Sequence, residues 1–310
     1  MPGVISTGSL PKLNWPGLKS ISGATYREHP KVYPHWTTRV ESDKAWEEYQ
    51  GITGFGFASV KQQGESMAFD SQQQGFNTRI TNMTVALGYV VTMEERMDNL
   101  YMDGGYRLAG SRAKMNSFSM IQTKEVFAHL MLNNAFSNSF PGADGVALCS
   151  TAHPTVTGLS LSNAANPAAD LNEASLEDGM IAIRGFVDDK NLFVDVHVKC
   201  LVIPRQLLYT ATRILKSPYQ SQSANNDINA LKYTGAIPEI VESIYLTSPG
   251  AWFLVTDTGM SGEGLIYQER MAPEPVQDND FDTRNFKAGI IERYAFGWDN
   301  WRSVYGSNGP

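Results

Sequence analysis

Apolar and polar residues alternate with different periods along the chain. Between residues 105 and 136 the apolar positions recur about every 3.6 residues, without an internal proline, which predicts one long helix. These positions are Leu108, Met115, Phe118, Ile121, Phe127, Leu130 and Met131. At about 1.5 Å per residue the helix would be roughly 48 Å long, which suits an extended scaffold better than a compact enzyme domain.

Alternation with a period of two predicts strands at residues 192–202 and 286–298, and shorter strands at 237–246, 252–256 and 264–267. Further helices are predicted at 42–50, with Ser42 as N-cap, and at 175–186, with Ser175 as N-cap and Asp178 in a capping box. Pro204 opens another helix. Together these elements predict an α+β fold with mixed or antiparallel sheets.

Residues 51–92 are predicted to form a long β-hairpin. Its return arm alternates Val85, Leu87, Tyr89 and Val91 with smaller residues, and its tip is polar and rich in glutamine. Such a hairpin buries little of its own surface, so it should lean on its own domain or on another chain.

The first fifty residues contain several prolines and glycines that break regular structure. They also carry aromatic residues that need a surface to cover: Trp15, Tyr26, Tyr33 and Trp36. Two alternatives follow. The segment packs on its own domain, or it is an arm that packs on a neighbouring subunit.

Composition narrows the class of protein. The 310 residues, 42% of them hydrophobic and 18% charged, are enough for two domains and too apolar for a disordered chain. The net charge of −7 argues against a surface built to bind DNA phosphates. No apolar run is long enough to span a membrane, and no secretory signal is expected at the N-terminus. Only two cysteines are present, which favours a reduced, intracellular origin.

Candidate catalytic and metal-binding residues are few. Cys149 and His153 lie four residues apart, but the sequence offers no third group to orient them, so an ordinary loop is the preferred interpretation over a nucleophilic pair. His197 and Cys200 differ in parity along one strand and should point to opposite faces.

Three aspartates have the spacing that opens a calcium-binding loop, namely Asp278, Asp280 and Asp282. The later positions carry Thr283 and Gly289 instead of the required glycine and glutamate. Phosphate-binding loops and serine-hydrolase motifs are missing from the sequence. We therefore expect no cofactor, no metal and no enzymatic activity.

Several stretches, taken in order, resemble the major capsid protein of tailed bacteriophages, with its Hong Kong 97-type fold. GESMAFDSQQQGF resembles the tip of that family's extended hairpin, the E-loop, and LGYVVTMEERMDNLY resembles the return into the spine helix. DGVALCSTAHP, LVIPRQLLYTATRIL with NNDIN, and TRNFKAGIIERYAFGWDNWRSVYG resemble later segments. The resemblance covers residues 40–306 and lies in the ordered series, not in one motif.

The resemblance implies an organisation. Residues 1–50 would be an N-terminal arm, 51–92 the E-loop hairpin, and 93–174 the peripheral domain with the spine helix. Residues 175–265 would be the axial domain, and 266–310 the return strand of the peripheral domain and the C-terminal segment.

The resemblance also implies partners. The chain would assemble with itself, as hexamers and pentamers, into an icosahedral shell in the virion around double-stranded DNA, built in the host cytoplasm. Scaffolding, portal and decoration proteins are further possible partners, and no membrane is involved. The residues expected at intersubunit contacts are Trp15, Trp36, Phe57, Lys61, Glu65, Phe69 and Phe76.

Some relatives crosslink their subunits through a lysine and an asparagine, and Lys61 is the only lysine between residues 45 and 113. The sequence does not identify its partner residues, so crosslinking stays an alternative. Two other functions also stay open: an encapsulin-like nanocompartment shell, and a soluble enzyme that uses Cys149 and His153.

Overall fold

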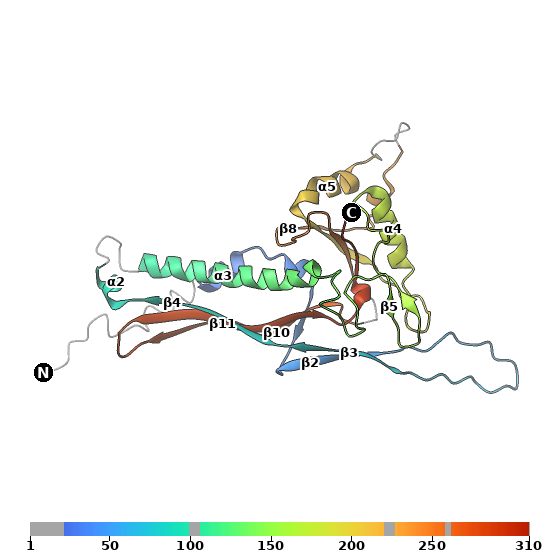
Figure 1. Cartoon of the computed structure of the whole chain (residues 1–310), viewed down its shortest axis with the longest axis horizontal. Helices are drawn as coiled ribbons and strands as arrows, with labels where there is room; N and C mark the ends of the chain where they lie inside the picture. The colour runs from blue at the N-terminus through green and yellow to red at the C-terminus, as the bar shows by residue number, and fades with distance from the viewer. Residues whose placement is uncertain (1–21, 99–105, 220–226, 258–261, 310) are drawn as a thin grey trace. The chain divides into compact units, whose positions relative to one another are not determined.

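The computed structural model of the chain describes residues 22–98, 106–219, 227–257 and 262–309 (Figure 1). Its helices and strands bear out a mixed α and β fold. The first elements are η2 (Tyr33–His35), β1 (Thr38–Glu41), β2 (Trp46–Ile52), β3 (Gln74–Thr81), β4 (Met83–Val91), α2 (Met93–Asp98) and α3 (Tyr106–Asn133). Residues 22–28 are also helical.

The later elements are β5 (His153–Pro154), β6 (Ser160–Leu161), α4 (Glu173–Arg184), β7 (Val198–Pro204), η3 (Arg205–Leu207), α5 (Leu208–Lys216), α6 (Ala230–Thr234), β8 (Ile240–Ser243), β9 (Trp252–Thr256), β10 (Leu265–Asn279), β11 (Phe286–Trp298), η4 (Trp301–Ser303) and β12 (Val304–Ser307). Among the described residues, no helix combines the length and apolarity that a bilayer-crossing segment needs.

The chain divides into two compact units, and each collects segments that are distant in the sequence. The first contains residues 1–31, 82–126 and 269–295, and the second contains residues 32–81, 127–268 and 296–310. Helix α3 and strands β10 and β11 each contribute residues to both units.

The first unit includes β4 and most of β10 and β11, which are neighbours in one sheet in the order β10-β11-β4, with α3 packed on them. Strand β11 pairs antiparallel with β4, so that Gly289 lies opposite Gly88 and Ile290 opposite Leu87. Ile290 is buried against Met120 and Ile121 of α3. The predicted long helix and the predicted strand 286–298 are therefore confirmed.

A buried ion pair lies between the helix and the sheet of this unit. Lys124 of α3 places its Nζ 2.6 Å from Oε2 of Glu292 on β11, and both side chains are almost fully buried. The Tyr26 hydroxyl donates a hydrogen bond of 2.9 Å to the same oxygen. Lys31 also lies over the Tyr26 ring, and its pKa is lowered by burial and by the charge of Lys124. The pair thus joins residues 22–31 to both α3 and β11.

The second unit is built on a four-stranded sheet of order β12-β9-β7-β8. Strand β7 pairs parallel with β8 and antiparallel with β9, and β12 pairs antiparallel with β9. Leu201 and Ile203 of β7 pack in one core cluster with Leu176 of α4 and Ala211 of α5. Cys200 and Val202, which alternate with them along the strand, are buried as well, and burial raises the pKa of Cys200 to about 12. Both faces of this strand are therefore covered, unlike the half-exposed strand that simple alternation predicts.

Helix α4 begins earlier than predicted. Its N-cap is Asn172, whose side chain accepts from the Ser175 amide while the Ser175 hydroxyl accepts from the Asn172 amide. Ser175 is therefore the N3 residue of the capping box and not the N-cap, and Asp178 does not take part. Gly179 lets the helix approach the sheet closely, because a Cβ there would lie 3.0 Å from Leu254 and Tyr305.

The predicted helix at residues 42–50 is wrong, because residues 46–52 form strand β2. Trp46 lies under the Arg79 guanidinium of β3, and Glu48 forms an ion pair of 2.6 Å with the same arginine. These cross-strand pairs outweigh the helical propensity of the segment.

The predicted hairpin at 51–92 is displaced in the same way. Its arms are β2 and β3, which pair antiparallel around the connecting loop at residues 53–73. Strand β4, taken from the sequence as the return arm, pairs with β11 instead.

The buried pair Lys124–Glu292 leads to a stability prediction. Replacing Glu292 with leucine alone should lower the free energy of unfolding by about 3–5 kcal/mol, because it leaves the Lys124 ammonium buried without its partner. The double variant Lys124→Met/Glu292→Leu should be more stable than that single variant. Urea unfolding of the wild type and the two variants measures both effects, and a double variant no more stable than Glu292→Leu would contradict the prediction.

Candidate functional site

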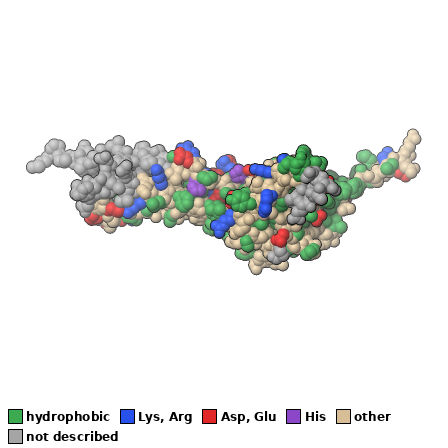
Figure 2. All heavy atoms as spheres, turned by 90° about the horizontal axis from the view of Figure 1, so that it is seen from above, with side chains coloured by type: hydrophobic (Ala, Val, Ile, Leu, Met, Phe, Trp, Pro, Cys, Tyr) green, Lys and Arg blue, Asp and Glu red, His purple; other side chains and the backbone are tan. Residues whose placement is uncertain are grey.

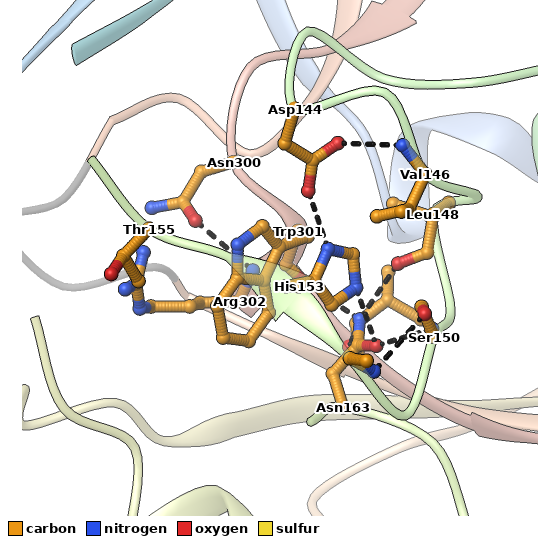
Figure 3. Close-up of polar contacts among 12 residues, drawn as sticks. Asp144, Val146, Leu148, Ser150, His153, Thr155, Asn163, Asn300, Trp301 and Arg302 are labelled. Carbon is orange, nitrogen blue, oxygen red and sulfur yellow. Dashed lines mark hydrogen bonds and ion pairs between the residues drawn. The ribbon is translucent and has the colours of Figure 1, made fainter. Parts of the chain in front are cut away.

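The region around Cys149 and His153 lies in the second unit, between the loops after α3 and the C-terminal segment (Figure 3). Nδ1 of His153 lies 2.6 Å from Oδ2 of Asp144, and Nε2 lies 2.9 Å from Oδ1 of Asn163. The imidazole also stacks on the Trp301 indole, with 4.4 Å between the ring centroids. His153 is 1% exposed, so its ring is held on two edges and one face.

Asn163 fixes the donor pattern of this cluster. Its Oδ1 accepts from the Ser150 amide at 2.8 Å. Its Nδ2 donates to the backbone carbonyls of Leu148, Trp301 and Val304 at 2.7, 3.0 and 2.9 Å. The amide orientation follows from these backbone partners, so Oδ1 faces His153 and the Nε2–H of the imidazole donates to it. The side chain links the loop at 148–163 to the last strand.

Cys149 does not form a nucleophilic pair with His153. The thiol is buried, and burial raises its pKa, which favours the protonated and unreactive form. Within the described residues the two side chains share no hydrogen bond, because both ring nitrogens of His153 face Asp144 and Asn163. The third group that the sequence did not reveal is Asp144, and it orients a structural histidine.

A cavity of about 350 Å³ lies beside this cluster, between the base of the β2–β3 hairpin and the C-terminal segment. It is lined by four carboxylates, each of which has partners in the chain. Asp144 pairs with His153, Asp189 with Arg302, and Asp188 and Asp299 accept from backbone amides.

Within the described ranges, no three His, Cys, Asp or Glu side chains are placed to hold a metal ion. Asp280, the middle one of the three aspartates with calcium-loop spacing, accepts hydrogen bonds from the Lys287 side chain and from the Asp282 amide.

The loop at residues 53–73 is the most exposed apolar segment of the second unit. Its large apolar side chains are 56% to 94% exposed, and they are Phe55, Phe57, Val60, Met67 and Phe69. Figure 2 shows hydrophobic side chains along the projecting loop at the right. Between residues 57 and 69 the described hydrogen bonds are confined to the turn from Gln62 to Glu65. We call residues 57–69 the loop tip.

The root of this loop is tied to the unit. The Thr53 amide donates to the Gln73 carbonyl at 2.9 Å, and the Thr53 hydroxyl donates to the same carbonyl and accepts from the Gln73 amide. Asp70 accepts from the Gly56 amide at 2.7 Å and pairs with Lys190 at 3.1 Å. The Gly56 amide, Lys190 and the Ser71 amide together lower the pKa of Asp70 to about 2. The loop is therefore held at its base while its apolar tip stays uncovered.

The residues expected at intersubunit contacts fall into three groups. Phe57, Lys61, Glu65 and Phe69 lie on the loop tip and are exposed, and Phe76 on β3 is 40% exposed. Trp36 is only 2% exposed and packs edge-on against His129 of its own unit, so its surface is already covered. For Trp36 the structure favours packing on its own domain. Trp15 lies outside the described residues.

Sequence reasoning missed the Asn163 cluster. No pattern marks Asn163, because its partners are backbone groups from three distant segments. The strand predicted at 192–202 begins only at Val198, so His197 lies just before β7 rather than on it. Its side chain is exposed, with Asp195 and Asp257 each 3.8 Å away.

A known protein family and several solved structures match this chain. A family model described as a phage capsid protein matches residues 116–307, well over half of the chain. No curated protein sequence matches.

Among solved structures, the procapsid of bacteriophage JBD30 is similar at 17% identity and a TM-score of 0.50, with 98% of this chain and 76% of that chain covered. A structure from Mycobacterium phage Patience gives 10% identity and a TM-score of 0.52, over 97% and 88% of the two chains. A virus-like particle from Pyrococcus furiosus gives 9% and 0.53, over 94% and 98%. At these identities the likeness concerns the fold.

The Asn163 cluster leads to the second prediction. Asn163→Ala should lower the free energy of unfolding by roughly 3 kcal/mol or more, because it leaves several buried backbone groups and the His153 ring without partners. Asn308→Ala, at an exposed position, is the matched control and should change little. Equal thermal stability of the two variants would contradict the structural role of Asn163.

The loop root leads to the third prediction. Carbon-13 NMR of the Asp70 carboxyl in the unassembled subunit should show a titration midpoint near 2. Any stabilisation from the ionised carboxylate is present above its unfolded pKa, near 3.8, and is lost as the pH falls through 2. Lys190→Met should raise the midpoint but keep it below 3.8, because the Gly56 amide still donates. An unchanged midpoint in this variant would show that Lys190 does not hold the carboxylate.

Proposed function

Because the chain belongs to the phage capsid protein family, we propose that it is the major shell subunit and that it assembles as hexamers and pentamers into an icosahedral capsid around double-stranded DNA. A structural role in the capsid is the function of this family, and we assign no catalytic activity to the chain. We further assign the Hong Kong 97-type fold, with β2, β3 and the loop at 53–73 as the E-loop and α3 as the spine helix.

The observation that carries this proposal is the uncovered loop tip. Phe57 is 71% exposed, Phe69 90% and Val60 94%. Contiguous apolar surface of this kind on a soluble chain marks a binding interface. These side chains are largely uncovered in the subunit, so in the assembled shell the tip would lie over an adjacent copy and bury them there.

The remaining assignments follow from the same premise. Residues 1–50 would act as the N-terminal arm, the segment near 175–265 as the axial domain, and the segments at 93–174 and 266–310 as the peripheral domain. The subunit would be part of the virion and be assembled in the host cytoplasm. Scaffolding, portal and decoration proteins are its proposed partners besides other copies of itself.

A nanocompartment shell is the second candidate function, because the virus-like particle from Pyrococcus furiosus is similar in fold. The two functions differ in cargo, so the contents of native particles distinguish them. Double-stranded DNA inside purified particles supports the phage capsid. Protein cargo without DNA supports the nanocompartment.

The fourth prediction concerns the loop tip. Phe69→Ser should raise the critical protein concentration for assembly by about ten- to a hundred-fold, because burying one such side chain contributes about 1.5–3 kcal/mol. The fold of the subunit should be unchanged, since the residue contacts little of its own chain. Sedimentation and electron microscopy measure the assembly. Gln63→Ser, in the same loop, is the matched control and should assemble as the wild type does.

If Phe69→Ser assembles at the wild-type concentration, the loop tip is not an intersubunit contact. If the wild-type chain remains a monomer under all assembly conditions, the proposed shell function is wrong.

A further inference from the structure

Opposite charges gather on two flanks of the second unit. The stretch from 205 to 234 carries four cations and one carboxylate, Asp227. The stretch from 170 to 183 carries four carboxylates and no lysine or arginine. The first stretch comprises η3, α5 and α6, and the second comprises α4 and the residues just before it.

The basic flank forms a stripe on one side of α5. Arg205, Tyr209, Arg213 and Lys216 follow one another at helical spacing and are all exposed, with Tyr209 76% exposed. Helix α6 extends this surface, because Asn229 donates to the Ile214 carbonyl and Lys232 donates to the Lys216 carbonyl at 3.0 Å. Tyr233, 63% exposed, follows on α6.

The cations of this flank lack acidic partners in the described part of the chain. Arg213 donates only to the Tyr209 carbonyl and the Thr210 hydroxyl, at 3.4 and 3.5 Å. Lys232 reaches a backbone carbonyl. The four positive charges are therefore available to an external partner.

The acidic flank has the same arrangement with the opposite sign. Asp178 and Ile181 are exposed on one side of α4, with Glu177 beside them, and Ile181 is 71% exposed. Glu173 in the first turn extends the flank. Over the described ranges none of these carboxylates forms an ion pair, whereas the next cation along the helix, Arg184, is already paired with Asp195 at 3.3 Å.

The sheet places the two flanks at opposite edges of the unit. The strand order is β12-β9-β7-β8, α4 packs against β12, and α5 packs against β8. Both helices share one core cluster, so their positions within the unit are fixed relative to each other (Figure 1). A copy thus presents a basic edge on one side and an acidic edge on the other.

We propose that the α5 flank of one copy docks on the α4 flank of the next copy. Tyr209 and Ile181 form the apolar centre of the contact. Arg205, Arg213 and Lys216 face Glu173, Glu177 and Asp178 around it. This inference rests on the proposed function, because it requires copies arranged in a shell, and it names the surfaces that join neighbours within one ring.

Charge decides the symmetry of the contact. A twofold contact would set each flank against its own copy and bring like charges together. A head-to-tail contact brings opposite charges together, and repeated around an axis it closes a ring. Because the charged groups are exposed at the rim, salt should weaken the contact.

Charge reversal provides the test. The basic-flank variant is Arg213→Glu/Lys216→Glu, and the acidic-flank variant is Glu177→Arg/Asp178→Arg. Each should raise the critical concentration for assembly at least about tenfold relative to the wild type. The variant with all four changes should assemble within about threefold of the wild type, because the pairs are restored with reversed sign. All positions are exposed or half-buried on the surface, and circular dichroism checks that each variant folds.

The design contains its own control for net charge. The two double variants change the net charge in opposite directions, whereas the fourfold variant retains the wild-type value of −7. A general charge effect would move the two double variants in opposite directions. A specific contact weakens both.

Mixing the two double variants adds a second readout. One variant has two acidic flanks and the other has two basic flanks, so a ring can close only if they alternate. The mixture should form even-membered rings and no pentamers, while each variant alone should form neither.

Three outcomes overturn the inference while leaving the proposed function intact. The double variants assemble as the wild type does, or the fourfold variant fails to recover, or the mixture forms pentamers. A wild-type chain that forms no shell under the same conditions contradicts the proposed function itself.

Discussion

Apolar side chains that the subunit cannot cover by itself are the constraint on which this structure depends. The second unit packs Leu201, Ile203 and Leu176 into a dry core, yet it leaves the phenylalanines of the loop tip in water. Burial of apolar surface is the largest favourable contribution to folding and association. Under the proposed function these side chains would be buried by contact with other copies.

Buried polar groups connect segments that are distant in the sequence. The Lys124–Glu292 pair fastens residues 22–31 to the first unit, and Asn163 fastens the loop at 148–163 to the C-terminal segment. Each resembles an active-site arrangement in composition: a buried charge pair, or a histidine beside an aspartate and a cysteine. Around His153 the ring nitrogens and the Asn163 amide are hydrogen-bonded within the protein, which describes a structural cluster rather than a site that accepts a substrate. In the ion pair, Oε2 of Glu292 meets Lys124 and Tyr26, whereas Oε1 is buried without a hydrogen-bond partner.

Periodicity predicted the parts of this fold that are long and locally consistent. The helix near 105–136 and the strands at 252–256 and 286–298 lie where apolar spacing placed them. The helix prediction at residues 42–50 was wrong because cross-strand contacts of Trp46 and Glu48 with Arg79 outweigh the helical propensity of the segment. Arg79 is about thirty residues away in the sequence. Composition indicated a polar loop tip, and its exposed phenylalanines were expected only from the family resemblance. The hydrogen bonding of His153 could not be predicted, because its partners meet only in the folded chain.

The firm root and free tip of the loop at 53–73 have a kinetic consequence. Ordering a chain segment costs about 1–2 kcal/mol per residue in conformational entropy, so each tip contact in the proposed shell would be weaker than its apolar area suggests. Weak individual contacts let a wrongly placed copy detach before its neighbours lock it in. The same loop would thus provide both the adhesion of the finished particle and proofreading during its growth.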